Sequence, residues 1–376
     1  MSRPARAVIN LDAARANLAR ARALAPASRV MAVVKADAYG HGLARMAQAF
    51  GDADAFGVAC LEEAITLRKS GVAKPIVLLE GPFSSEEVAE IRRYWTDTVV
   101  HSEEQLAMIE GQPGPATLDV WLKIDTGMHR LGVPPEIAPD VWRRLQACPA
   151  VRRPLRLMTH LACAQDRDAS VAEQLAVFAS AIEGLPGEHC IANSAGLIAW
   201  PAARADWVRP GLMLYGVSPF ADTIAAQEGL QPVMTLASEL IAVRRLRAGE
   251  AVGYGATWRC PQEMSVGVVA IGYGDGYPRH AASGTPVLVN GRRAALVGRP
   301  SMDMLTVDLR NVPNAQVGDP VILWGDGLPV EEVARYADTI PYALLCGVRM
   351  RVHFEVVDFA LQPAMTHRRV SRGLPS

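Results

Sequence analysis

Over the first 216 residues, short apolar runs alternate with longer segments of helical periodicity, and this alternation limits the fold more than any other feature. Strands that alternate with helices form a parallel sheet, because each helix returns the chain to the start of the next strand. We count eight strand-like runs, the number that closes a (β/α)8 barrel (TIM barrel): RVMAVV (29–34), AFGVAC (55–60), PIVLLEG (75–81), TDTVVHS (96–102), LDVWLKID (118–125), RLMTHLA (156–162), HCIANSAG (189–196) and WVRPGLMLYG (207–216). Ser102 is a suitable N-cap for the helical pattern that follows it.

The chain beyond about residue 228 has a different pattern. Short β-branched runs punctuated by glycine replace the helical segments, as in EMSVGVVAIGYGDGYPR and TPVLVNGRRAALVGRP. Asn290-Gly291 between two apolar runs predicts a tight hairpin. The sequence therefore predicts a barrel over residues 1–228 and a C-terminal all-β domain over residues 229–376.

Composition narrows the class of protein. The formal net charge is −1, which argues against a nucleic-acid partner or a membrane surface. No apolar stretch is long enough to span a bilayer, and the start MSRPARAVINLDAARANL lacks the features of a signal peptide. The six cysteines are scattered and the histidines show no metal-ligand spacing. A cytoplasmic enzyme without a metal is the expectation.

Lys35 ends the first strand-like run in an otherwise lysine-poor chain. Only four of the 38 basic residues are lysine, so a lysine retained beside apolar residues suggests a role that arginine cannot fill. Lysine can lose its proton and attack a carbonyl, whereas arginine stays charged. Because active sites of such barrels lie at the carboxyl ends of the strands, Lys35 would project into the site. The alternative is a strand-end lysine that reaches solvent.

The segment MAVVKADAYGHG around Lys35 resembles the pyridoxal-phosphate attachment motif of bacterial alanine racemases. Seven further segments are similar to that family's segments, in its order: LKIDTGMHRLG (122–132), THLA (159–162), ANSAG (192–196), VRPGLMLYG (208–216), VGYGATW (252–258), IGYGDGYPR (271–279) and GRPSMDM (298–304). The resemblance covers nearly the whole chain. It implies a (β/α)8 barrel followed by a β domain, and a homodimer whose active sites borrow residues from the partner subunit.

The resemblance also implies how the cofactor, pyridoxal 5′-phosphate, is held. Tyr39, Ser194 and the backbone N–H groups of Gly211 and Leu212 would bind its phosphate. Arg209 would face its pyridine nitrogen and, as a permanent cation, discourage protonation there. From the residues alone, Arg209 reads as one surface arginine among 34.

Racemisation needs two groups on opposite faces of the α-carbon, one to remove the proton and one to return it. The resemblance assigns Lys35 to one face and Tyr254 of the other subunit to the opposite face, acting on the aldimine of the cofactor. His160 would link Arg209 to the tyrosine, and Asp303 would help to position it. Without the resemblance, His160 reads as a structural histidine and Tyr254 as a strand or turn aromatic.

Three further assignments rest on the same resemblance. Arg130 and the N–H of Met302 would bind the substrate carboxylate, since a forked donor suits a planar anion. Lys123 would carry a carbamate that faces the arginine. The segment VRMRVHF places Met350 where the family often has an entrance tyrosine, which leaves the size limit on the substrate open.

The sequence thus predicts an alanine racemase that interconverts L- and D-alanine, for peptidoglycan precursors or for D-alanine catabolism. A decarboxylase of basic amino acids would need a catalytic cysteine and an acidic cluster, which we do not find. A racemase with broader specificity stays open because of Met350. A non-catalytic pyridoxal-phosphate carrier would match at Lys35 but would lack the β domain that holds Tyr254.

Overall fold

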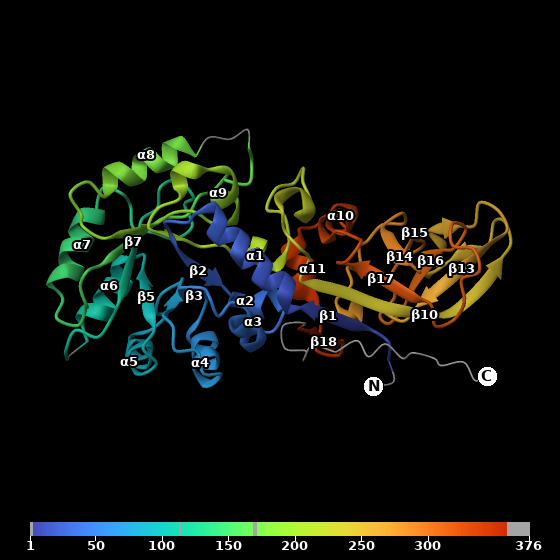
Figure 1. Cartoon of the computed structure of the whole chain (residues 1–376), viewed down its shortest axis with the longest axis horizontal. Coiled ribbons are helices and arrows are strands. Elements are labelled where there is room, and N and C mark those ends of the chain that lie inside the picture. Colours follow the sequence, from blue (N-terminus) through green and yellow to red (C-terminus); the bar gives the residue numbers. More distant parts are fainter. Residues whose placement is uncertain (1–2, 113, 168–170, 359–376) are drawn as a thin grey trace, which may run out of the picture.

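The computed structural model describes residues 3–112, 114–167 and 171–358. The chain forms a barrel and an elongated β domain that lie side by side (Figure 1). No helix among these residues is both long and apolar enough to pass through a bilayer.

Eight parallel strands close into a barrel, as the alternating pattern predicted. Parallel strands buried on both faces read as apolar runs, which made most of the eight recognisable, although Glu188 and His189 interrupt one of them. The strands are β2 (Arg29–Val33), β3 (Ala55–Val58), β4 (Ile76–Leu78), β5 (Asp97–Val100), β6 (Val120–Lys123), β7 (Arg156–Met158), β8 (Glu188–Cys190) and β9 (Trp207–Val208).

One side chain from each strand fills the barrel interior. These eight residues form a separate buried cluster: Met31, Ala55, Val77, Val99, Trp121, Met158, Cys190 and Trp207. Trp121 and Trp207 meet edge to face, with ring centroids 5.5 Å apart. The interior is therefore a packed core, and chemistry is confined to the loops at the strand ends.

Helices cover the outside of the barrel (Figure 1). They are α1 (Leu11–Leu24), α3 (Leu43–Ala49), α4 (Leu61–Lys69), α5 (Ser85–Arg93), α6 (Glu103–Glu110), α7 (Ala138–Ala147), α8 (Ala172–Ala181) and α9 (Ser194–Ala199). The predicted cap is confirmed, because the Ser102 hydroxyl accepts a hydrogen bond from the N–H of Gln105 at the start of α6.

The second sheet has eight strands in the order β13-β16-β15-β14-β17-β10-β1-β18. Its strands are β1 (Arg6–Asn10), β10 (Met234–Leu246), β13 (Met264–Val269), β14 (Pro286–Val289), β15 (Arg292–Leu296), β16 (Leu305–Asp308), β17 (Pro320–Trp324) and β18 (His353–Val357). The long strand β10 also pairs with β13, so six strands close on themselves. A separate small ribbon pairs β11 (Ala251–Val252) with β12 (Trp258–Arg259). The Asn290-Gly291 hairpin joins β14 to β15, with both residues at positive φ.

The first strand departs from the predicted division of the chain. We expected residues 1–228 to belong to the barrel, but β1 pairs with β10 and β18 in the second sheet. Both ends of the described chain therefore meet in the β domain, and α1 carries the chain from there to the barrel. A five-residue strand does not by itself indicate which sheet it joins.

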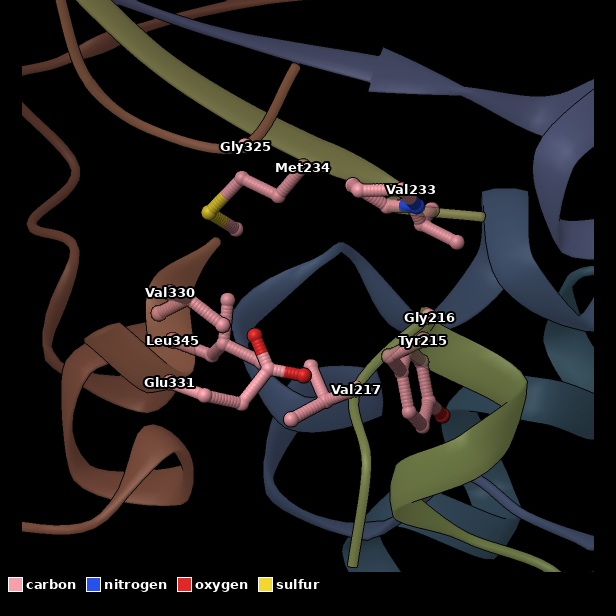
Figure 2. A pocket seen from close by; sticks show the side chains of 10 residues that line it. Tyr215, Gly216, Val217, Val233, Met234, Gly325, Val330, Glu331 and Leu345 are labelled. Carbon is pink, nitrogen blue, oxygen red and sulfur yellow. The ribbon is translucent and has the colours of Figure 1, made fainter. Parts of the chain in front are cut away.

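Two helices of the β domain lie where it meets the barrel, α10 (Val330–Tyr336) and α11 (Pro341–Gly347). The buried carboxylate of Glu331 on α10 accepts hydrogen bonds from the N–H groups of Ser218 and Ala225. A small cavity at this junction is lined by Glu331 together with Tyr215, Val217 and Leu345 (Figure 2). These bonds join α10 to the segment that follows the barrel, and α11 packs against α2 at the strand ends.

Candidate active site

The carboxyl ends of the barrel strands gather basic side chains around Lys35. Lys35 follows β2, Lys123 ends β6, His160 follows β7 and Arg209 follows β9. Lys123 and Arg209 are buried, and the positive charges of Arg209, Arg130 and Lys35 all act on Lys123. We call these loops at the strand ends the barrel mouth. The fold thus brings Lys35 together with basic residues that are at least 88 positions away in the sequence.

The backbone after Lys35 turns in the left-handed direction. In the segment labelled α2 (Lys35–Gly40), the residues from Ala36 to Tyr39 have φ between 51° and 55°. None of these four is glycine, and each left-handed residue costs about 1–2 kcal/mol relative to the right-handed form. Residues in such conformations persist only where surrounding contacts hold them.

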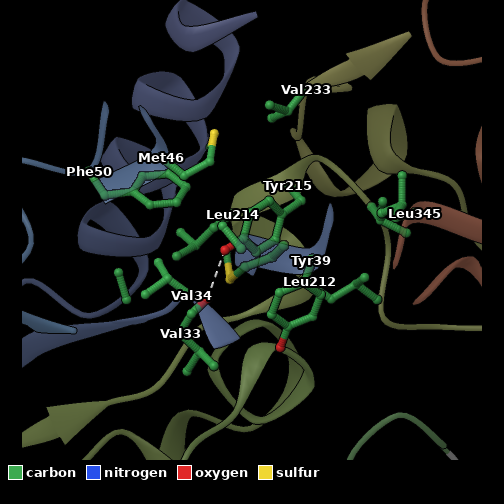
Figure 3. Close-up of a cluster of buried hydrophobic side chains, with 14 of the residues drawn as sticks. Val33, Val34, Tyr39, Met46, Phe50, Leu212, Leu214, Tyr215, Val233 and Leu345 are labelled. Atoms are coloured by element: carbon green, nitrogen blue, oxygen red, sulfur yellow. Dashed lines mark hydrogen bonds between the residues drawn. The ribbon is translucent and has the colours of Figure 1, made fainter. Parts of the chain in front are cut away.

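The left-handed turn aims Tyr39 at the loop that follows β9. The Tyr39 ring stacks on Tyr215 with centroids 4.5 Å apart, and the Tyr215 hydroxyl donates to the Val33 carbonyl at 2.9 Å (Figure 3). A Cβ on Gly211 would lie 2.4 Å from the Tyr39 hydroxyl oxygen, so only glycine allows this approach. Burial raises the pKa of Tyr39 well above its usual value, so its hydroxyl stays protonated as a donor.

Ser194 organises the same loop from the start of α9. Its hydroxyl oxygen accepts from the N–H of Gly211 at 2.9 Å and from that of Met213 at 3.3 Å, which leaves its own hydrogen to donate outward. We predicted that the N–H of Gly211 would face a phosphate, but it is engaged by Ser194. Leu212 begins the short helix η2 (Leu212–Tyr215), where an N–H has no partner in the helix. Tyr39, Ser194, Gly211 and Leu212 nevertheless lie together.

Arg209 is held by acceptors on two neighbouring strands. Nη1 donates to the Cys190 carbonyl at 3.1 Å and contacts its Sγ at 2.9 Å, while Nη2 donates to the Thr159 carbonyl at 2.8 Å. Nη2 also lies 3.3 Å from Nδ1 of His160. In the described part of the chain, Nε of Arg209 makes no hydrogen bond and is not fully enclosed, so it can still donate to a ligand.

The clustered positive charge and burial shift two neighbouring groups. They lower the pKa of His160 to about 3, with burial as the largest cause and Arg209 next, so the imidazole is neutral. They lower the pKa of Lys123 to about 8 for the same two reasons. A site with this much positive charge suits a ligand with several negative charges.

Arg130 is presented by a loop that folds around Asp125. One carboxylate oxygen of Asp125 accepts from the N–H groups of Gly127, Met128 and His129, each at 3.0 Å. The Arg130 side chain is exposed and close enough to the cluster to act on both Lys123 and His160. An exposed guanidinium beside buried cations is suited to a small carboxylate.

Tyr342 is a residue of the barrel mouth that sequence reasoning missed. It lies on α11, with its ring 5.8 Å from that of Tyr39, and burial raises its pKa. Met350, which we expected at the entrance, lies beyond the end of α11 and is 100% exposed, so within one chain Tyr342 is the residue placed beside Tyr39. The signal was available in IPYALLCG, which places a tyrosine at the start of a helix that packs on α2.

The predicted residues of the β domain are not brought to Lys35 within one chain. Tyr254 is 68% exposed on the turn η4 (Tyr254–Ala256), and Met302 is 53% exposed on the loop between β15 and β16. Among the described residues, no contact joins either to Lys35. Asp303, beside Met302, pairs with Arg351 at 2.6 Å and with Arg3 at 3.5 Å, and within the described ranges no hydrogen bond joins it to Tyr254.

The barrel mouth fits a phosphorylated aldehyde cofactor. Lys35 offers an amine, Tyr39 and Ser194 offer hydroxyl donors beside a glycine that leaves room, and Arg209 offers a free Nε–H. The charge of the cluster suits a phosphate and a carboxylate together. Among the residues that the structure describes, no group of three or more His, Cys, Asp or Glu side chains could hold a metal ion.

Comparison with known proteins gives the same answer for both parts of the chain. The family "Alanine racemase, N-terminal domain" matches residues 9–219, and "Alanine racemase, C-terminal domain" matches residues 233–356. The alanine racemase of Halorhodospira halophila is 54% identical over 360 residues, covering 95% of this chain and 99% of that protein. The alanine racemase of Vibrio cholerae is 53% identical over 349 residues, covering 93% and 97%.

Solved structures agree. The biosynthetic alanine racemase of Pseudomonas aeruginosa superposes with a TM-score of 0.92 at 47% identity, covering 95% of this chain and 100% of that one. The alanine racemase of Bartonella henselae, solved with covalently bound pyridoxal phosphate, gives 0.84 at 28% identity, covering 94% and 99%. The chain belongs to the alanine racemase family, pyridoxal-phosphate-dependent isomerases that interconvert L- and D-alanine.

Proposed function

We propose that Lys35 and Tyr254, from two different subunits, are the two bases with which this chain racemises alanine. The observation that carries the proposal is the partly buried Arg209–His160 contact near Lys35, which keeps a neutral imidazole at the barrel mouth. When bound, pyridoxal phosphate withdraws electrons from the α-carbon of the amino acid and so acidifies its proton. The chain supplies the rest: attachment, orientation and proton transfer.

Five residues would hold the cofactor. Lys35 would attach it through its amine, and Tyr39, Ser194 and the N–H of Leu212 would bind its phosphate. Arg209 would direct Nε–H at the ring nitrogen. Because a guanidinium does not give up its proton, that nitrogen would stay unprotonated, which limits charge delocalisation into the ring and disfavours side reactions.

Tyr254 would reach the site from a second copy of the chain. It is exposed, as is Met302, so both are free to enter a partner's barrel mouth. The proposal requires a homodimer with shared active sites, with residues 1–228 mainly forming the barrel and residues 229–376 supplying Tyr254 and Met302. A cytoplasmic location stays a prediction.

His160 would stabilise the deprotonated form of the partner's Tyr254. Since Nδ1 faces an Arg209 N–H, the hydrogen of the neutral imidazole lies on Nε2 and can be donated to a phenolate oxygen. A phenolate is the form of tyrosine that accepts a proton from carbon. Lys35 would act on the opposite face in its neutral form.

The substrate carboxylate would be bound by Arg130 and by the N–H of the partner's Met302. The Ser301 carbonyl, which shares a peptide group with the N–H of Met302, accepts from the N–H of Tyr273 at 3.0 Å, and this bond orients that N–H. The salt bridge of Asp303 to Arg351 would hold this loop rather than touch the tyrosine.

Lys123 would carry a carbamate. A neutral amine attacks carbon dioxide, one N–C bond forms and one proton is released. The lowered pKa of about 8 makes the neutral amine more available at physiological pH. The resulting anion would face Arg130, so attraction between opposite charges would replace the repulsion between the Lys123 ammonium and the guanidinium.

The assay uses the purified protein with pyridoxal phosphate and L-alanine in heavy water, read by chiral separation and mass detection. D-Alanine with deuterium at the α-carbon is the expected product. Deuterium found only in L-alanine would mean that the proton leaves and returns on one face, which contradicts the role of Tyr254. Absence of both products would contradict the proposed site.

A further inference from the structure

His41 is buried at the end of the left-handed turn and is not used by the proposed chemistry. Its Nδ1 lies 2.9 Å from the Tyr39 carbonyl oxygen and 3.1 Å from the Ala38 carbonyl oxygen. Both partners are acceptors, so the hydrogen of the ring is on Nδ1 and is shared between them. The imidazole therefore binds the backbone of the turn from inside.

Glu63 binds the other end of the turn from helix α4. One carboxylate oxygen accepts from the N–H of Ala36 at 2.6 Å, and the other accepts from the N–H of Ala59 at 2.8 Å. Ala36 directly follows Lys35, and Ala59 follows β3. A single carboxylate thus ties the peptide after Lys35 to the neighbouring strand end.

We propose that His41 and Glu63 are positioning residues that hold the left-handed turn, and through it set where Lys35 and Tyr39 meet the cofactor. The inference rests on the proposed attachment of pyridoxal phosphate to Lys35. It extends that proposal to two side chains that touch neither cofactor nor substrate.

The backbone bonds of the turn leave the carbonyl of Tyr39 to a side chain. The N–H of Ala38 donates to the Val34 carbonyl, and the N–H groups of His41 and Gly42 donate to Ala38 and Asp37. Among the contacts of the described residues, the Tyr39 carbonyl has no donor other than His41 Nδ1. Losing that donor would leave a buried carbonyl unpaired in a segment that already has an unfavourable conformation.

A role for His41 in proton transfer does not fit its surroundings. Nε2 is enclosed without a hydrogen-bond partner in the described part of the chain, and the ring packs 4.8 Å from that of Tyr215. Burial lowers the pKa of His41 to about 4, so the ring is neutral in the working range. The imidazole acts as a fixed N–H donor.

Two substitutions separate the position of the donor from the bulk of the ring. His41→Asn places an amide nitrogen where Nδ1 lies, whereas His41→Gln places its amide further out, near the position of Nε2. Glu63→Gln retains the length of the side chain but offers one acceptor oxygen in place of two. Glu62→Gln, on the exposed face of α4, is the matched control for Glu63.

The measurement is the Kd of pyridoxal phosphate for each apoprotein, by titration of the visible absorbance, together with kcat at saturating cofactor and the apoprotein Tm. We expect His41→Gln and Glu63→Gln to raise Kd by about tenfold, the equivalent of one lost buried hydrogen bond. Their kcat should fall as Lys35 shifts. His41→Asn should restore most of the affinity, and Glu62→Gln should match the wild type.

Wild-type Kd and kcat in His41→Gln would overturn the inference. Equal losses of cofactor affinity and of Tm in His41→Asn and His41→Gln would also overturn it, because they would indicate that the ring has a purely structural role. Borohydride reduction followed by peptide mass analysis separates this failure from that of the proposed site. If the wild type carries the cofactor on Lys35 and the variants bind normally, only the inference fails. If the label lies elsewhere in the wild type, the proposed attachment fails.

Discussion

Nη2 of Arg209 lies 3.3 Å from Nδ1 of His160, a contact that fixes which nitrogen of the imidazole carries its hydrogen. An arginine N–H can only donate, so Nδ1 must accept and Nε2 must hold the proton. Burial and the charge of Arg209 lower the pKa of His160 to about 3, so the ring does not take up a second proton near neutral pH. The contact creates a neutral donor at the barrel mouth.

The low pKa of His160 predicts a loss of stability in acid. The unfolded chain binds this proton near pH 6.5 and the folded chain only near pH 3, so the stabilising contribution is present above pH 6.5 and is lost as the pH falls. The slope should be up to about 1.4 kcal/mol per pH unit for this group. The unfolding midpoint of His160→Gln, measured from pH 7.5 to 4, should fall less steeply than that of the wild type. Parallel curves would contradict the prediction, and His280→Gln, at an exposed position, is the control.

The position of Tyr342 at the barrel mouth leads to a test of which residue limits the size of the substrate. Tyr342 lies beside Tyr39 and is 39% exposed, whereas Met350 is fully exposed. Tyr342→Ala should raise the ratio of kcat/KM for serine over alanine by about tenfold, since the side chain limits the space at the mouth. Met350→Ala should leave this ratio unchanged. A shift of the ratio in Met350→Ala alone would restore the assignment made from the sequence.

Lys123 predicts an adduct that depends on pH and on carbon dioxide. Because burial and Arg209 lower its pKa from 10.5 to about 8, its neutral fraction grows as the pH rises through 8. Protein equilibrated with ¹³C-labelled carbon dioxide should give a carbamate carbonyl signal that increases from pH 7 to 9 by carbon-13 NMR. Lys123→Met should lack the signal, and Lys69→Met, at an exposed helix end, should retain it. A signal unaffected by Lys123→Met would contradict the assignment.

Removal of the Asp275 carboxylate is expected to lower the stability of the fold and to weaken substrate binding. Its carboxylate is fully buried and accepts from Arg351 at 2.6 Å and from Arg3 and the N–H of Gly272 at 2.8 Å. Asp275→Ala should cost about 3 kcal/mol, the lower end for a broken buried pair because both arginines are partly exposed. The KM for alanine should rise because the loop of Met302 loosens. Denaturant unfolding and steady-state kinetics check both effects, with exposed Asp326→Ala as the control; a wild-type free energy of unfolding would contradict the account.

The barrel was predictable because most of its strands are buried on both faces and read as largely apolar runs. The membership of β1 was not, because Arg6–Asn10 has the alternating burial of a sheet exposed on one side, and either sheet could have accepted it. Pairing between β1 and β10 joins residues more than 220 positions apart. Local periodicity carries no information on such a contact.

The position of Lys35, His160 and Arg209 at the barrel mouth was predictable, because each lies within two residues of a strand end. The left-handed turn was not, since Ala36, Asp37, Ala38 and Tyr39 favour right-handed backbone and only distant contacts reverse it. Tyr342 was missed because its place beside Tyr39 depends on how α11 docks on the barrel. The hydrogen bond from the N–H of Gly211 to Ser194 could not be predicted, because it forms only where two loops meet. For that reason the N–H was assigned to a phosphate.

The sharing of each site between two subunits is tested most directly by mixing two inactive variants. Lys35→Ala and Tyr254→Phe should each lack racemase activity. After unfolding and joint refolding in equal amounts, half of the dimers are mixed and each of these has one site with both bases intact. The account predicts about a quarter of the wild-type activity, a fraction that follows from the symmetry of a two-fold dimer. No recovery, with mixed dimers confirmed by mass, would show that Lys35 and Tyr254 do not serve one site from different chains.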